Sequence, residues 1–333
     1  MQIENLSAIV MALTFIAYSL LGGADFGGGV WDLLAFGRHK EASRQLIAHA
    51  IGPIWEANHV WLIAFIVFFF TCFPTAFAAI SIALHVPLAL AALGIVLRGA
   101  SFTFRSFPDD PMQNHWGLIF SVASAVTPIF FGVVIGTTIS GNLVWLDSKI
   151  YASGYFLPWL SIFPWIMGCF ILSLFTYLAA VYLCVEAEGE LKDYFRIRAV
   201  LTLLAVLILG SAVLLKAPAH FSQKLSEPQS IVTFFGAIAL SVCALITLLK
   251  RKFVLARTLS ASMAITALGM LAYLQAPYLI APQFTILSSA APPSTHRMVL
   301  SIGAAGALLL IPSLFYLLLT FKGRKAFSLF DYS

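Results

Sequence analysis

The residues able to do chemistry lie inside two long apolar stretches near the start of the chain. Asp25 stands in LGGADFGGGVWD, and Glu56, Asn58 and His59 stand in WEANHVW. An ionisable side chain inside a membrane span costs at least a few kcal/mol, so it normally faces a protein interior or a water-filled path and has a partner. These residues therefore suggest movement of protons or cations.

The spacing within WEANHVW favours proton exchange. Glu56 and His59 are three residues apart, so on a helix they are neighbours and can share a hydrogen bond. An imidazole beside a carboxylate can hold and release a proton near neutral pH. Trp55, Asn58 and Trp61 lie at helical spacing around the pair and are predicted to orient it. A purely structural pair stays open, whereas a metal site from Asp25, Glu56 and His59 lacks a further clear ligand, so none is predicted.

Asp25 and Glu56 are predicted to meet. Asp25 lies almost as far before the polar turn at residues 37–45 as Glu56 lies after it. Two antiparallel helices joined by a tight connection bring equidistant positions to the same depth. The two carboxylates are therefore expected within reach of each other, with Asp25, Glu56 and His59 forming a proton path.

The elements that carry these residues are membrane spans. Of the 333 residues, 61% are hydrophobic and only 10% are charged, which indicates an all-α, polytopic integral membrane protein. About nine stretches are long enough to cross a bilayer. They are Leu6–Ala35, Leu46–Phe70, Thr75–Leu97, Trp116–Ile139, Phe156–Val185, Val200–Leu215, Ile231–Leu249, Val254–Gln275 and Met298–Phe321.

The chain is expected to form one transmembrane domain over residues 1–333. Its first four helices, within residues 1–140, carry the acidic residues. A second group of four helices occupies residues 150–275, and a ninth helix occupies residues 296–322. The small residues around Asp25, with Gly23 and Gly27 four apart, predict a face where another helix approaches closely.

Basic residues decide the predicted orientation. Nearly all of them fall in alternate connections, beginning with the turn at residues 37–45, which by the positive-inside rule places the N-terminus outside and the C-terminus in the cytoplasm. Arg98 and Arg105 are interpreted as lipid-headgroup anchors, as contacts to a partner subunit or as contacts to the cytoplasmic mouth of a proton path. The net charge of +5 is explained by the basic residues expected in the cytoplasmic connections of a membrane protein, so no nucleic-acid partner is expected.

Residues 15–107 resemble a known family. GPIWEANHVWLI, with LLGGADFGGGVWDLLAFGR before it and LHVPLALAALGIVLRGASFTFRS after it, is similar to subunit II of cytochrome bd-type quinol oxidases, in the branch that includes cyanide-insensitive oxidases. By position, Asp25 and Glu56 match the acidic residues of that family. The chain has Gly22 in place of the first acid of the family's frequent Asp-Gly-x-Asp, so one carboxylate is missing. It has Glu56 where many members have Asp, and His59 where some have Gln.

The resemblance implies a non-haem subunit of a quinol:oxygen oxidoreductase in the cytoplasmic (inner) membrane of a bacterium. Haems b and d and the quinol site would belong to the partner subunit I, against which this chain packs while supplying a cytoplasmic proton path for reduction of O2 to water. No catalytic centre is expected in this chain alone. Some members hold a structural quinone, and a small single-helix subunit is a further possible partner along with quinol and lipids.

Two other classes of function remain open from the residues themselves. A proton-coupled secondary transporter would also place carboxylates such as Asp25 and Glu56 in mid-membrane. A purely structural or assembly subunit would explain the glycines and aromatic residues while leaving the carboxylates inert.

Overall fold

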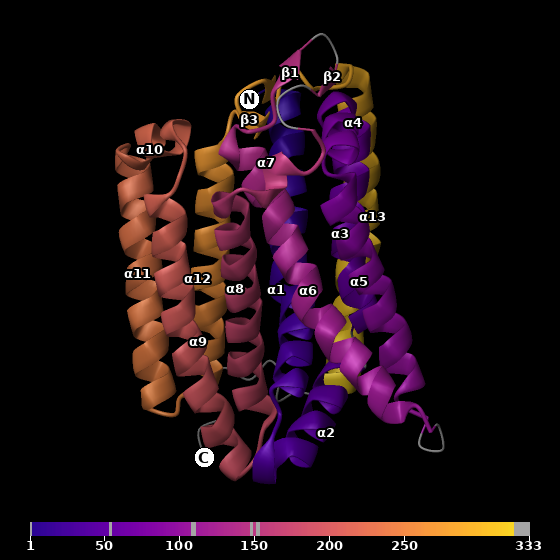
Figure 1. The fold of residues 1–333 in the computed structure, drawn as a ribbon, viewed down its shortest axis with the longest axis vertical. Helices are drawn as coiled ribbons and strands as arrows, with labels where there is room; N and C mark the ends of the chain where they lie inside the picture. The colour runs from indigo at the N-terminus through magenta and orange to yellow at the C-terminus, as the bar shows by residue number, and fades with distance from the viewer. Residues whose placement is uncertain (1, 53–54, 108–110, 147–148, 151–153, 323–333) are drawn as a thin grey trace.

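The spans form an elongated bundle of helices. The computed structural model describes residues 2–52, 55–107, 111–146, 149–150 and 154–322 (Figure 1). Within them, nine helices are long and apolar enough to cross a membrane, which confirms a multi-pass, all-α membrane protein. They are α1 (Ile3–Leu33), α3 (Trp55–Cys72), α5 (His85–Phe104), α6 (Gln113–Ser140), α8 (Ile162–Glu186), α9 (Glu190–Leu215), α11 (Pro228–Leu249), α12 (Phe253–Gln275) and α13 (Pro293–Lys322).

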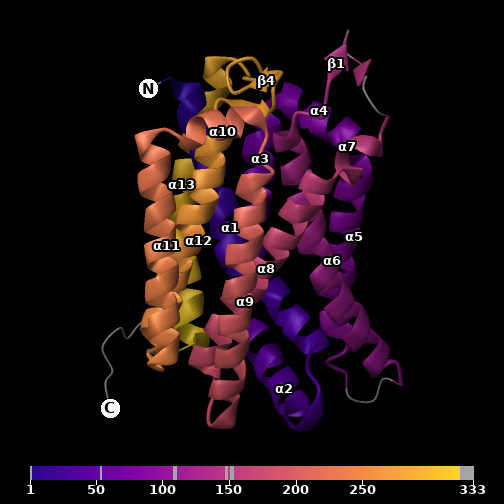
Figure 2. The same cartoon turned by 60° about the vertical axis from the view of Figure 1, so that its left-hand side comes forward.

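Shorter elements cover the two ends of the bundle. They are η1 (Gly37–His39), α2 (Lys40–Ile51), α4 (Pro74–Ala83), α7 (Leu157–Leu160) and α10 (Ala219–Leu225), with antiparallel pairs β1 (Trp145–Leu146) with β2 (Lys149–Ile150) and β3 (Tyr278–Ile280) with β4 (Phe284–Thr285). Figures 1 and 2 show α2 at one end, here called the α2 end, and α4, α7, α10 and the strands at the other, called the hairpin end.

Three predicted spans are each divided in the structure. The expected Phe156–Val185 span is formed by α7 and α8, which are separated by Ser161. The expected Leu46–Phe70 span is formed by α2 and α3, on either side of residues 53–54, which lie outside the described residues. The sequence reads Gly52-Pro53 there, and a proline favours extended backbone in the residue before it and cannot donate to a helical ladder. The expected Thr75–Leu97 span is formed by α4 and α5, which meet at Leu84. Pro87 lacks the N–H that would bond to Ala83, so the ladder is interrupted at that point.

The core of the bundle is built around α8, which packs against α1, α6, α9 and α12. α1 and α8 approach so closely that a Cβ atom on Gly27 would lie 2.1 Å from the carbonyl oxygen of Phe175, and one on Gly23 would lie 2.7 Å from the Phe175 ring. Only glycine fits at such a crossing. The predicted close helix approach around Asp25 is therefore confirmed, and it fixes the face of α1 that α8 covers.

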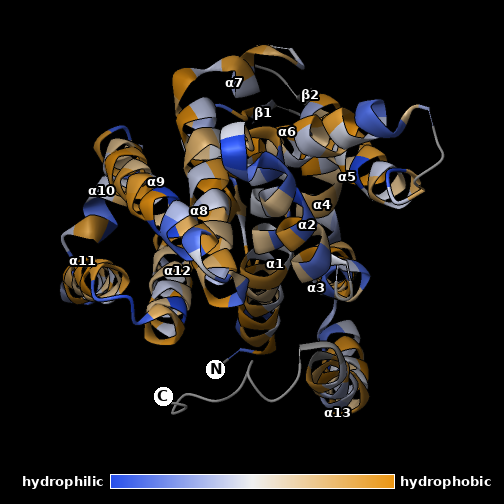
Figure 3. Cartoon of the chain, turned by 90° about the horizontal axis from the view of Figure 1, so that it is seen from below, coloured by the Kyte–Doolittle hydropathy of each residue, from blue (hydrophilic) through white to orange (hydrophobic). Residues whose placement is uncertain are grey.

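Polar residues gather at the α2 end. Figure 3 views the bundle from that end, and the segments coloured as hydrophilic there lie on α2 and on the neighbouring ends of other helices. Ion pairs join the connections at this end, with Arg38 Nη2 2.6 Å from Glu190 Oε2 and Arg251 Nη2 3.0 Å from Asp193 Oδ2. The lateral surface is apolar, with large exposed side chains such as Ile63. This distribution is the one expected of a protein held in a bilayer.

Candidate functional site

Asp25 is held inside the bundle by an amide from α3. Its side chain is 5% exposed, and Asn58 Nδ2 donates a 2.7 Å hydrogen bond to Asp25 Oδ2. Asn58 is itself buried, so the contact lies between α1 and α3, away from lipid. A hydrogen bond to a carboxylate in such surroundings is stronger than one between neutral groups. Asn58 therefore holds the Asp25 carboxylate in place.

Arg98 lies in the same interior. It is 1% exposed, its guanidinium carbon lies 4.9 Å from the centre of the Phe26 ring, and it interacts electrostatically with Asp25. This burial corrects the expectation that Arg98 anchors the chain to lipid headgroups. The expected span ended near Leu97, whereas α5 continues to Phe104, so Arg98 stands nearly two turns inside the helix and faces α1 rather than the interface.

Glu56 lies on the outward face of α3. Its side chain is exposed, whereas Asn58, two residues later, is buried. Two residues correspond to about 200° of rotation around a helix, so the two side chains point in nearly opposite directions. The expectation that Glu56 is the buried partner of Asp25 is therefore wrong. Asn58 supplies the hydrogen bond from α3, and Glu56 faces whatever covers this side of the chain.

His59 lies between these two groups and is half-buried. Its Nδ1 is 2.8 Å from the Trp55 carbonyl oxygen, so the expected hydrogen bond to Glu56 is not formed. The carbonyl can only accept, which places the proton on Nδ1 and leaves Nε2 as an acceptor in the neutral ring. The ring centre lies 5.8 Å from that of Tyr18 and 5.9 Å from that of Trp55. Trp55 thus orients His59, while Trp61 is half-buried nearby on the same helix.

A second buried acid, which the sequence analysis did not identify, lies near the end of α1. Asp32 is 1% exposed and accepts a 2.7 Å hydrogen bond from Ser121 Oγ. Arg105 Nη1 lies 3.3 Å from one of its carboxylate oxygens, and Arg44 Nε lies 3.8 Å from the other. Arg105, whose side chain is only 13% exposed, is therefore an intramolecular partner of Asp32, which corrects its interpretation as a lipid or subunit contact.

The two acids and their arginines share one spacing. Asp32 follows Asp25 by seven residues on α1, and Arg105 follows Arg98 by seven residues at the end of α5. Seven residues are almost two full helical turns, so each pair of side chains lies on one face. Both helices run from the hairpin end to the α2 end (Figure 1). The first acid interacts with the first arginine and the second acid with the second, as Asp25 does with Arg98 and Asp32 with Arg105. This repeat was the available signal for Asp32.

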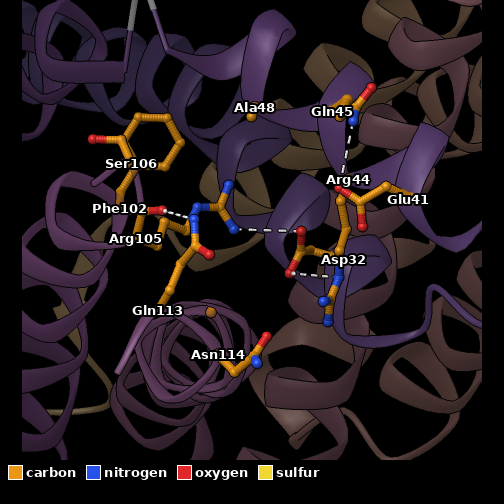
Figure 4. A pocket seen from close by; sticks show the side chains of 11 residues that line it. Asp32, Glu41, Arg44, Gln45, Ala48, Phe102, Arg105, Ser106, Gln113 and Asn114 are labelled. Carbon is orange, nitrogen blue, oxygen red and sulfur yellow. Dashed lines mark hydrogen bonds and ion pairs between the residues drawn. The ribbon is translucent and has the colours of Figure 1, made fainter. Parts of the chain in front are cut away.

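A polar pocket of about 270 Å3 reaches Asp32 at the α2 end. Figure 4 shows the Asp32 carboxylate between the guanidinium groups of Arg44 and Arg105. The other polar residues that line the pocket are Glu41, Gln45, Ser106, Gln113 and Asn114. The pocket contains groups that can bind water and exchange protons, and it lies at the end of the bundle where the basic connections gather.

The side chains gathered at this site include groups that can exchange protons. Within the described ranges, no group of three or more His, Cys, Asp or Glu side chains comes together as a metal site would require. Along α1, α3 and α5 the structure places two buried carboxylates, buried hydroxyls, a half-buried imidazole, and one buried and one partly buried arginine. Carboxylate and imidazole groups can take up and release protons, whereas the arginines stay charged.

Known proteins resemble this chain over nearly its whole length. The profile of the family described as cytochrome bd terminal oxidase subunit II matches residues 3–321. The cytochrome bd ubiquinol oxidase subunit 2 of Bacillus subtilis is 30% identical over 152 residues, which are 45% of this chain and 44% of that protein. The cytochrome bd-I ubiquinol oxidase subunit 2 of Escherichia coli K12 is 26% identical over 203 residues, 60% of this chain and 53% of that protein. The chain thus spans about half the length of these two relatives.

A longer match and a solved structure agree with the same fold. A putative cytochrome bd menaquinol oxidase subunit II of B. subtilis is 22% identical over 342 aligned positions, covering 96% of this chain and 95% of that protein. A chain in the structure of bd oxidase from Geobacillus thermodenitrificans superimposes with a TM-score of 0.81 at 23% identity, covering 96% and 99% of the two chains. By the family match across residues 3–321, the chain belongs to the cytochrome bd terminal oxidase subunit II family.

Proposed function

We propose that this chain is the non-haem subunit of a bacterial quinol:oxygen oxidoreductase and that it carries protons from the cytoplasm toward a haem-bearing partner subunit. The names of its relatives, which are ubiquinol or menaquinol oxidase subunits, support the reaction class. The complex would oxidise quinol and reduce oxygen to water, with haems b and d held by the partner. This chain would supply protons and a packing surface.

The observation that carries the proposal is the outward position of Glu56. α3 has few buried residues, and Glu56 lies on its exposed face, in the first turn of a helix long enough to cross the membrane. A carboxylate facing lipid would cost a few kcal/mol, so a protein partner covering this face is the more stable arrangement. Glu56 then becomes the group through which a proton leaves this chain for the partner.

Asp25 and His59 would be the groups inside the chain that bind and release the proton. Asp25 is fixed by Asn58 and lies beside Arg98, and His59 stands on the same helix as Glu56, one turn further along. The Nε2 atom of His59 is buried and has no hydrogen-bond partner among the described residues, so it can accept a proton within the bundle. In this proposal Asp25 loads the proton, His59 adjusts its transfer and Glu56 passes it on.

The basic connections support a cytoplasmic position for the α2 end. Arg38, Arg44 and Arg105 all lie at this end, together with Lys192 and Arg251. The positive-inside rule then places the polar pocket on the cytoplasmic side and the N-terminus outside. Proton uptake from the cytoplasm and release of quinol protons outside would contribute to the proton motive force.

The test replaces Glu56 with glutamine in the assembled, haem-replete oxidase. Loss of a proton-transferring group typically costs on the order of a hundredfold in rate, so we expect quinol oxidation to fall by at least about tenfold. Glu188→Gln is the matched control, because Glu188 is an exposed acid in the connection between α8 and α9. Undiminished turnover in Glu56→Gln would overturn the proposed role.

A further inference from the structure

Buried polar atoms without partners follow one face of α5. The atoms are Arg98 Nε and Nη2, Ser101 Oγ and Arg105 Nη2, none of which has a hydrogen-bond partner among the described residues. Residues at i, i+3 and i+7 lie on the same side of a helix, so the three side chains form a stripe that runs from the interior to the α2 end. Ser101, between the arginines, is 0% exposed.

The stripe has a continuation at each end. At the α2 end it reaches the polar pocket, where Arg44 Nε is also buried and without a hydrogen bond in the described part of the chain. At the inner end lie Tyr18 Oη and His59 Nε2, which are also buried and have no hydrogen-bond partner among the described residues. Tyr18 packs against His59 and interacts electrostatically with both Arg98 and Asp25. A line of polar atoms therefore joins the pocket to the surroundings of Asp25.

Water is the partner that fits these atoms. Burying a polar group without a hydrogen bond is unfavourable, and ordered waters normally satisfy such groups by making two to four bonds each. The guanidinium groups supply donors, His59 Nε2 supplies an acceptor, and the Ser101 and Tyr18 hydroxyls supply both. A bound anion is a poorer fit because two carboxylates, Asp25 and Asp32, already lie beside the arginines.

We propose that a file of water molecules runs along the Arg98–Ser101–Arg105 face of α5 and connects the polar pocket to Asp25. The inference rests on the proposed function, for which it names the entry route. A proton taken up at the pocket passes from water to water, each accepting one proton and releasing another, until the Asp25 carboxylate receives one. The arginines donate hydrogen bonds to the water oxygens, which keeps the waters in place beside the apolar side chains, and they remain protonated throughout.

Phe120 packs against both arginines of the stripe. The centre of its ring lies 4.0 Å from the guanidinium carbon of Arg105 and 5.5 Å from that of Arg98, so the ring stands next to both. Phe120 is fully buried. Its position beside the stripe makes it a reporter for water in the file, because a buried ring that touches bound water can be oxidised by radicals formed from that water.

The first experiment is radiolytic hydroxyl-radical footprinting of the intact oxidase. We expect Phe120 to be labelled several times faster than Phe175, a phenylalanine that is equally buried but packs against α1 within the apolar core. The labelling of Phe120 should decrease in Ser101→Val, which fills the space beside the hydroxyl. If Phe120 is labelled no faster than Phe175, the water file does not exist.

The second experiment asks whether the file carries protons. In Ser101→Ala we expect turnover to fall by about tenfold, because the loss of one hydrogen bond of ordinary strength changes a rate by about that factor. The fall should be larger at higher pH, where fewer protons are available for uptake. Ser124→Ala is the control, because Ser124 is fully buried but bonds to the Phe120 carbonyl oxygen of its own helix. Unchanged turnover and pH profile in Ser101→Ala, with Phe120 still labelled, would overturn the route.

The outcome is separable from that of the proposed function. Should Glu56→Gln lose activity while Ser101→Ala retains it, the chain conducts protons by another entrance, and only the water file along α5 is excluded. Should Glu56→Gln retain activity, the proton-carrying function fails whatever the footprinting of Phe120 shows.

Discussion

The side of the bundle that contains α1 and α5 buries very different side chains from the side formed by α8, α9, α11 and α12. Among the described residues, the buried Asp and Arg side chains are Asp25, Asp32 and Arg98, and all three belong to α1 and α5. Across α8, α9, α11 and α12 the buried polar groups are hydroxyls, such as that of Tyr177, which lies 2.6 Å from Ser260 Oγ. Charges inside a membrane protein are costly, so their restriction to one side indicates where function is concentrated.

The cavities on the two sides differ in the same way. The pocket beside Asp32 is lined by charged and amide side chains, whereas a cavity of about 330 Å3 between α8, α9, α11 and α12 is lined almost entirely by apolar residues. Hydroxyls on the second side mostly bond within their own helices, as Thr247 does with the Cys243 carbonyl oxygen. Such local bonds satisfy the side chain without requiring a polar path. The proposed function assigns proton conduction to the first side, here called the conducting side, and packing to the second, called the packing side.

The largest expected effect comes from removing a charge on the conducting side. Arg98→Met keeps the length of the side chain but leaves Asp25 without its buried counter-charge, and breaking such a pair costs about 3 to 5 kcal/mol. We expect the assembled complex to unfold at a much lower concentration of sodium dodecyl sulfate. A variant as stable as the parent would show that Asp25 does not depend on Arg98.

The double variant Asp25→Asn with Arg98→Met sharpens this result. Removing both charges should restore most of the lost stability, because neither charge is then left buried without a partner. Turnover should stay low, since the acid that loads the proton is absent. Recovery of stability and turnover together would mean that the pair only holds helices.

The smallest expected effect lies on the packing side. Tyr177→Phe removes the hydrogen bond to Ser260 and should lower the free energy of unfolding by about 1 kcal/mol, with turnover unchanged. Ser260→Ala is the companion variant and should behave alike. A clear fall in turnover in either variant would contradict the division between a conducting and a packing side.

Much of the fold could be predicted from the sequence because long apolar runs can satisfy their backbone groups in a bilayer only as helices. The rotation of each helix about its axis could not. Asn58 rather than Glu56 reaches Asp25, and Arg98 faces α1 rather than lipid, because helix phase depends on how neighbouring helices pack. α3 carries almost no directional hydrophobic pattern that would have revealed its buried face.

Asp32 was missed for a related reason. It stands near the end of a span, beside the basic turn at residues 37–45, where acids are usually solvated. In the structure α2 and α6 cover it, through Arg44 and Ser121. The matching seven-residue steps from Asp25 to Asp32 and from Arg98 to Arg105 were visible in the sequence. They gain meaning only once the arginine side chains of α5 are known to reach α1.

The most direct test of the conducting side is proton uptake by Asp25→Asn in the complete oxidase reconstituted into vesicles. Asparagine preserves the shape and the hydrogen bond to Asn58 but cannot carry a proton. During a single turnover with oxygen, proton uptake from the cytoplasmic side and oxygen reduction should slow together, by at least about tenfold. Uptake at the parental rate in a stable, haem-replete Asp25→Asn complex would contradict the account.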